Sequence, residues 1–178
     1  MKASHLVLCL IDLLGIVAIP TAAQTLGERM DEEGTAWIIG EWTLSSSPPA
    51  MNVNTIKYEW DLDRRIVLMS MERQRDSYKY HGMMLFVPSK KELVGMGADS
   101  AGGTYRVSCR TKDTALIHSF VRTTADGSVG EVDMVCTKAD GDTMKVDTFV
   151  ITGEGDRRSS EPLTSGTYKR EKALAEDK

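Results

Sequence analysis

The sequence predicts an all-β domain, an antiparallel up-and-down meander of about ten short strands that closes into a barrel. Three observations support this prediction. Segments of alternating apolar and polar residues follow one another from Asn54 to Ile151. Turn residues such as Asp126-Gly127 separate them, as in hairpins. The hairpins also follow one another without the long crossovers of a Greek-key β-sandwich, which is the alternative architecture. Closing the meander into a barrel removes the exposed edges of its first and last strands.

Residues 1–23 have the layout of a cleaved signal peptide. Lys2 is followed by an apolar run from Leu6 to Ile19, and the small residues Thr21-Ala22-Ala23 precede Gln24. The run is too short to span a membrane as a helix, and no later stretch is long and apolar enough. We therefore expect the mature protein to be secreted or periplasmic.

The acidic segment at residues 24–35 is predicted to be a linker, with a turn of helix that closes the base of the barrel. The barrel domain is predicted at residues 36–171 and a charged tail at 172–178. The first strand is predicted from Ala36 to Leu44, because the proline-containing stretch after it cannot continue a ladder. Turn residues bound the later strands, which are predicted at 54–62, 66–72, 78–87, 92–98, 104–111, 114–123, 129–138, 143–151 and 167–170.

Two motifs resemble those of the calycin group of barrels. Gly40-x-Trp42 opens the first strand, and Tyr168-Lys169-Arg170 lies in the last. In calycins the early Trp closes one barrel end, and a basic residue of the final strand lies across its ring. The resemblance implies a calycin-like barrel with a structural plug formed by Gly40, Trp42, Lys169 and Arg170.

From about Trp37 to Arg170 the chain also resembles a family of uncharacterised secreted bacterial domains with lipocalin-like barrels. Such members often carry an aromatic-Asp-Pro turn, where this chain has Phe86-Val87-Pro88, so this turn departs from the pattern. The family has no agreed function, so the resemblance implies a fold and not a chemistry. The shared motifs, in order after the Gly-x-Trp, are Tyr58-Glu59-Trp60-Asp61, Tyr80-His81-Gly82, Asp99-Ser100-Ala101-Gly102-Gly103 and Ala125-Asp126-Gly127.

The inward face of the strands supplies the candidate ligand-binding residues. In the second strand, alternation with charged residues places Ile56, Tyr58, Trp60 and Leu62 on this face. Barrels of more than about eight strands leave space inside, and methionine walls tolerate varied ligands. We therefore predict a small hydrophobic or amphipathic ligand; a packed, methionine-filled barrel acting as a structural or interaction module is the alternative. The candidates are Tyr58, Trp60, Met69, Met71, Tyr105, Met134 and Met144.

The sequence contains no recognised catalytic motif. Glu59 and Asp61 could act as an acid and a base, although their pattern is typical of a solvated outer face. An enzyme with an unrecognised site in the barrel is thus a further alternative. Neither His81 nor His118 has a second His or Cys at ligand spacing, so no metal or other cofactor is predicted. The net charge of −4 argues against a nucleic-acid partner.

Cys109 and Cys136 are both predicted to face the lumen. Counting from the turns places Cys109 opposite Leu116 and Cys136 opposite Ile117, one strand apart. Two inter-strand spacings amount to about 9.5 Å. A disulfide needs Cα atoms within about 7 Å. The sequence therefore predicts two free, buried thiols.

Overall fold

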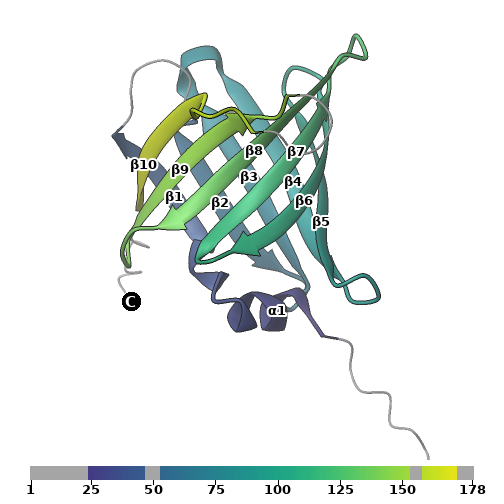
Figure 1. The fold of residues 1–178 in the computed structure, drawn as a ribbon, viewed down its shortest axis with the longest axis vertical. Coiled ribbons are helices and arrows are strands. Elements are labelled where there is room, and N and C mark those ends of the chain that lie inside the picture. The colour runs from purple at the N-terminus through teal and green to yellow at the C-terminus, as the bar shows by residue number, and fades with distance from the viewer. Residues whose placement is uncertain (1–23, 47–52, 153–157, 172–178) are drawn as a thin grey trace, which may run out of the picture.

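The computed structural model describes residues 24–46, 53–152 and 158–171. Ten strands form a closed antiparallel barrel in which sequence neighbours pair and β1 completes the circle by pairing with β10 (Figure 1). The predicted all-β meander is therefore confirmed. The strands are β1 (Gly40–Ser46), β2 (Thr55–Asp61), β3 (Ile66–Arg73), β4 (Tyr78–Val87), β5 (Glu92–Asp99), β6 (Thr104–Lys112), β7 (Ala115–Thr123), β8 (Val129–Lys138), β9 (Thr143–Val150) and β10 (Thr164–Arg170).

Most strand boundaries differ from the predicted ones by a few residues, and the differences at β1 and β2 have clear causes. β1 begins at Gly40, because Ala36–Ile38 forms a short 3-10 helix, η1. Leu62 does not continue the inward face of β2: it is 61% exposed and opens a turn in which Leu62, Asp63 and Arg64 all have positive φ. The predicted signal peptide and charged tail lie outside the described residues.

The segment predicted as a linker forms the helix α1 (Leu26–Glu32), which covers one end of the barrel (Figure 1). Thr25 caps the helix, and the side chain of Glu28 completes a capping box. The side chains of Leu26 and Met30 are buried in the hydrophobic core. Arg64, from the turn between β2 and β3, donates hydrogen bonds to the Asp31 carboxylate. We call this end of the barrel the base.

Trp42 packs against η1 near the base and has no exposed surface. Its indole N–H donates to the carbonyl oxygen of Ile38 over 2.7 Å, and the Arg170 guanidinium carbon lies 4.2 Å from the centroid of its ring. Gly40 makes this arrangement possible, because its φ is +132° and a Cβ there would lie 2.5 Å from a guanidinium nitrogen of Arg170. Lys169 points elsewhere, to the hydroxyl of Thr143.

Candidate ligand-binding site

A cavity of about 230 Å³ lies at the end of the barrel opposite α1. Its lining begins at Val53, just before β2, and includes Arg73 at the end of β3 and Thr164 at the start of β10. These positions are far along each strand from the turns that meet α1. We call this end of the barrel the open end. The barrel therefore has one covered end and one end with unfilled space.

The wall of the cavity is mostly apolar. Met71, Tyr105 and Met134 are the predicted ligand-binding residues that line it. The other main wall residues were not among the predicted ligand-binding residues, although alternation placed Ile56 and Val146 on the inward face and could have identified most of the others. These residues are Ile56, Phe120, Val132, Val146 and Tyr168. Their arrangement can bind an apolar guest by excluding water from it.

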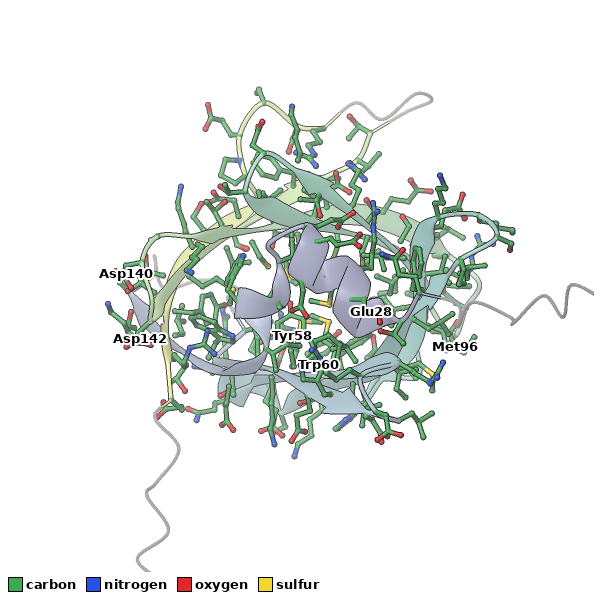
Figure 2. All side chains as sticks on the ribbon, turned by 90° about the horizontal axis from the view of Figure 1, so that it is seen from below. Glu28, Tyr58, Trp60, Met96, Asp140 and Asp142 are labelled. Atoms are coloured by element: carbon green, nitrogen blue, oxygen red, sulfur yellow. The ribbon has the colours of Figure 1, made fainter. Side chains whose placement is uncertain are left out.

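The other predicted ligand-binding residues lie away from the cavity. Tyr58, Met69 and Met144 are buried in the core. Trp60 lies at the base, partly buried, with the Arg64 guanidinium carbon 4.9 Å from its ring centroid. Figure 2, seen from below, shows Tyr58 and Trp60 within the ring of strands. These side chains are therefore packed in the lower part of the barrel, whereas the cavity described above lies at the open end.

Tyrosine hydroxyl groups supply polar atoms at the rim of the cavity. The hydroxyl oxygens of Tyr78 and Tyr105 are 2.9 Å apart, and the Tyr105 hydroxyl donates to Asp99 over 2.8 Å. Arg122 forms a salt bridge with the same carboxylate over 2.8 Å. Arg73 pairs with the Asp76 carboxylate and lies over the ring of Tyr78. Because both arginines already have carboxylate partners, the rim favours a neutral polar group on the guest over a charged one.

Asp99 organises the loop between β5 and β6 at this rim. Its carboxylate accepts hydrogen bonds from the backbone N–H groups of Ala101 and Gly103, at 2.9 and 2.8 Å. Burial alone would raise the pKa of Asp99, but the Gly103 N–H, the Tyr105 hydroxyl and Arg122 hold it below its ordinary value. Burial raises the pKa of Tyr105, so Tyr105 stays neutral and acts as a hydrogen-bond donor.

A chain of polar side chains crosses the packed part of the barrel. His118 is fully buried, with Nδ1 3.2 Å from Cys109 Sγ and Nε2 3.2 Å from the Tyr58 hydroxyl, which in turn lies 4.0 Å from Cys136 Sγ. Burial lowers the pKa of His118 to about 4 and raises the pKa of each thiol to about 12. All these groups are therefore neutral at neutral pH, and the Cys109–His118 pair lacks the thiolate that a cysteine nucleophile needs.

The register of the two cysteines differs from the predicted one. Cys109 lies opposite His118 and Cys136 opposite Leu116, whereas the predicted partners were Leu116 and Ile117. For Cys109 the cause is the turn between β6 and β7, which is centred on Asp113-Thr114 and not on Lys112-Asp113, and this shift of one residue moves the partner by two. For Cys136 the cause is the loop between β7 and β8, which is centred on Asp126 and not between Asp126 and Gly127, and this moves the partner by one. Both thiols are nevertheless free, although only Cys136 is a buried residue and Cys109 is partly exposed.

We expect a full-length chain carrying Cys9→Ala to show two reactive thiols when it is denatured without reductant. Both should react slowly in the native protein, because burial disfavours the thiolate. Thiol counting with a chromogenic disulfide reagent, before and after addition of denaturant, measures this. A count of zero after denaturation would show that Cys109 and Cys136 form a disulfide, and the pairing of β6, β7 and β8 would then be wrong.

The outer surface carries a separate apolar row. Leu68, Met83 and Met96 lie side by side on β3, β4 and β5 and border a shallow hollow of about 1040 Å³. Met96 is 63% exposed and projects from the outside of the barrel in Figure 2. Glu59, also outward-facing, forms a salt bridge with Lys57 over 2.8 Å. It therefore belongs to the solvated outer face and does not point into the cavity.

Comparison with known proteins found no match to this chain among either the protein-family models or the curated proteins. Within the part of the chain that the structure describes, no helix is both long and apolar enough to cross a membrane. Fold and site therefore define the class. The chain forms a closed ten-strand antiparallel barrel, consistent with a calycin-like fold and compatible with ligand binding in the lumen.

Proposed function

We propose that this protein is an extracytoplasmic barrel that binds a small hydrophobic or amphipathic molecule at its open end. The observation that carries the proposal is the unfilled, mostly apolar cavity of about 230 Å³. An engineered apolar cavity of ~150 Å³ in another protein stays dry and binds benzene. An apolar guest that enters such a cavity leaves water and gains packing contacts.

The size of the cavity restricts the guest. Pockets for drug-sized ligands usually hold roughly 300–1,000 Å³. A volume of about 230 Å³ suits one or two fused rings or a short acyl segment, and is too small for a long fatty acid. A hydroxyl or similar neutral group on the guest would meet Tyr78 and Tyr105 at the rim. Met71 and Met134 make the wall pliant, so selectivity among similar guests is expected to be low.

The extracytoplasmic address belongs to the proposal. It is supported by the basic start, apolar run and small residues of positions 1–23. Membership of the secreted bacterial family with lipocalin-like barrels is proposed on the same footing. It is supported by the order of the shared motifs between Trp37 and Arg170.

We expect the wild-type protein to bind 2-naphthol with micromolar affinity, and Met134→Trp to weaken this binding at least ~10-fold. About ten ring carbons at about 0.8 kcal/mol each give roughly 8 kcal/mol. This corresponds to a dissociation constant of roughly 1 μM before the costs of ordering the guest weaken it. Met134 lines the cavity, so a larger ring there occupies the space of the guest. Isothermal titration calorimetry measures both affinities.

Met96→Trp is the matched control, because it makes the same substitution on the outer face of the barrel. It should leave the affinity for 2-naphthol unchanged. Equal binding by the two variants would contradict the cavity as the site. If the wild-type protein binds no apolar probe, the carrier function is wrong. The barrel would then be a structural or interaction module, with Leu68, Met83 and Met96 as its outer contact surface.

A further inference from the structure

In the packed part of the barrel, Cys109 lies next to two further side chains that can bind a metal ion, Met84 and His118. Cys109 Sγ lies 3.3 Å from Met84 Sδ and 3.2 Å from His118 Nδ1. The three side chains come from β6, β4 and β7, and none of them lines the cavity at the open end. A thiolate, a thioether and an imidazole are the ligand types that favour Cu(I).

We propose that Cys109, His118 and Met84 bind one Cu(I) ion. In the described part of the chain, no three side chains of His, Cys, Asp and Glu gather around one point. The third ligand is therefore the thioether of Met84, and thioethers bind hard ions such as Mg²⁺ poorly. The site is independent of the proposed guest cavity, so the failure of either proposal leaves the other standing.

The distances are close to those that a metal ion needs. Metal-bound sulfur and imidazole nitrogen atoms, each about 2.0–2.3 Å from an ion, lie roughly 3.5–4 Å from one another. Cys109 Sγ lies 3.3 Å from Met84 Sδ and 3.2 Å from His118 Nδ1, so each of these two pairs would separate by a few tenths of an ångström around an ion. Met84 can make this movement, because its unbranched side chain has three rotatable bonds. Cys109 is partly exposed as a residue, whereas Met84 and His118 are buried.

Tyr58 supplies the outer partner that a metal-binding histidine usually has. Its hydroxyl oxygen lies 3.2 Å from His118 Nε2, the nitrogen that faces away from Cys109. When the Tyr58 hydroxyl oxygen accepts a hydrogen bond from Nε2–H, it holds His118 in the tautomer whose Nδ1 carries a free lone pair. The Tyr58 hydroxyl can then donate to Cys136 Sγ, 4.0 Å away. Cys136 therefore orients the chain without contacting the ion.

The proton balance of binding is simple. The thiol of Cys109 loses its proton to solvent as the Cu–S bond forms, and neutral His118 and Met84 donate lone pairs without a change of charge. The ion and the thiolate together carry no net charge, which suits a buried site.

The test is an anaerobic Cu(I) titration of a full-length chain carrying Cys9→Ala, in competition with the chromophoric chelator bicinchoninate. We expect one Cu(I) ion per chain, and an X-ray absorption spectrum with two sulfur scatterers and one nitrogen scatterer. Met84→Leu should weaken binding about 10–100-fold, and Cys109→Ser by more than about 100-fold. Tyr58→Phe, which removes only the outer partner, should weaken binding about 10–100-fold.

Met96→Leu is the matched control for Met84→Leu, since Met96 lies outside the barrel beside Met83. It should leave the affinity unchanged. Circular dichroism of each variant shows whether the barrel is folded, and Met84→Leu keeps the volume of a core residue nearly constant. The proposal is overturned if the chelator retains all the copper. It is also overturned if folded Met84→Leu and Cys109→Ser bind as tightly as the parent, or if Met96→Leu alone abolishes binding.

Discussion

Replacing Trp42 with alanine is expected to lower the free energy of unfolding by about 3–5 kcal/mol, because large-to-small substitutions of fully buried aromatic residues cost this much. Trp42 has no exposed surface, and its N–H bond to Ile38 is buried. Its contact with the Arg170 guanidinium contributes about 0.5–2 kcal/mol of the loss. Since domains are stable by only about 5–15 kcal/mol, the variant should be unfolded or nearly so.

Denaturant unfolding of the wild type and the variant, followed by circular dichroism, measures this loss. Trp60→Ala is the matched control, because Trp60 also lies at the base beneath an arginine but remains partly exposed. Its cost should be nearer the ordinary value of about 1 kcal/mol for a point substitution. A cost below about 1 kcal/mol for Trp42→Ala would show that Trp42 does not close the barrel.

Asp99→Ala is expected to lower the free energy of unfolding by about 3 kcal/mol, the lower end of the cost of breaking a buried ion pair. The variant leaves Arg122 without its carboxylate and removes the acceptor of the Ala101 and Gly103 N–H groups. Arg122 keeps about a third of its side chain in water, so it can rehydrate in part. Thermal and denaturant unfolding measure the cost, and Glu59→Ala, on the solvated outer face, should change stability by less than about 1 kcal/mol.

The pH dependence of stability gives a second readout for Asp99. Its pKa in the folded protein lies below that of the unfolded chain, which is about 3.9 for aspartate. The stability that this carboxylate contributes is therefore complete above the unfolded pKa and is lost as the pH falls through the folded pKa. Asp99→Ala should reduce the acid destabilisation of the protein. The role of Asp99 in the rim would be contradicted if Asp99→Ala lowered the free energy of unfolding by less than about 1 kcal/mol and left the loss of stability at acid pH unchanged.

The fold could be predicted from local patterns, because strand alternation and turn residues act over a few positions. Val129–Lys138 and Tyr78–Val87 have the bounds that the sequence predicted. Turn centres are harder to predict. Placing the turn at Asp113 one residue too early gave Cys109 a partner two residues away from the true one, His118. The start of β1 was missed because Ala36–Ile38 is apolar like a strand, although it packs as a 3-10 helix.

The site could be predicted only in part, because parity tells which residues face inward but not at what depth. Met71 and Met134 line the cavity, whereas Met69 and Met144, which also face inward, lie in the packed core. Depth depends on the tilt of the strands and on which end α1 covers. The sulfur cluster at Met84 was missed for a similar reason: it depends on how far the Met84 side chain of β4 reaches inside the barrel, past β5, toward β6 and β7.

A crystal structure of the protein soaked with 6-bromo-2-naphthol tests the binding site most directly, because anomalous scattering locates the bromine atom without prior assumptions. We expect one strong peak inside the barrel at the open end, among Met71, Phe120 and Met134. The naphthol hydroxyl should lie within hydrogen-bonding distance of Tyr78 or Tyr105. An empty cavity at saturating probe, or a peak only on the outer face beside Met83 and Met96, would contradict the proposal that this barrel holds a guest in its lumen.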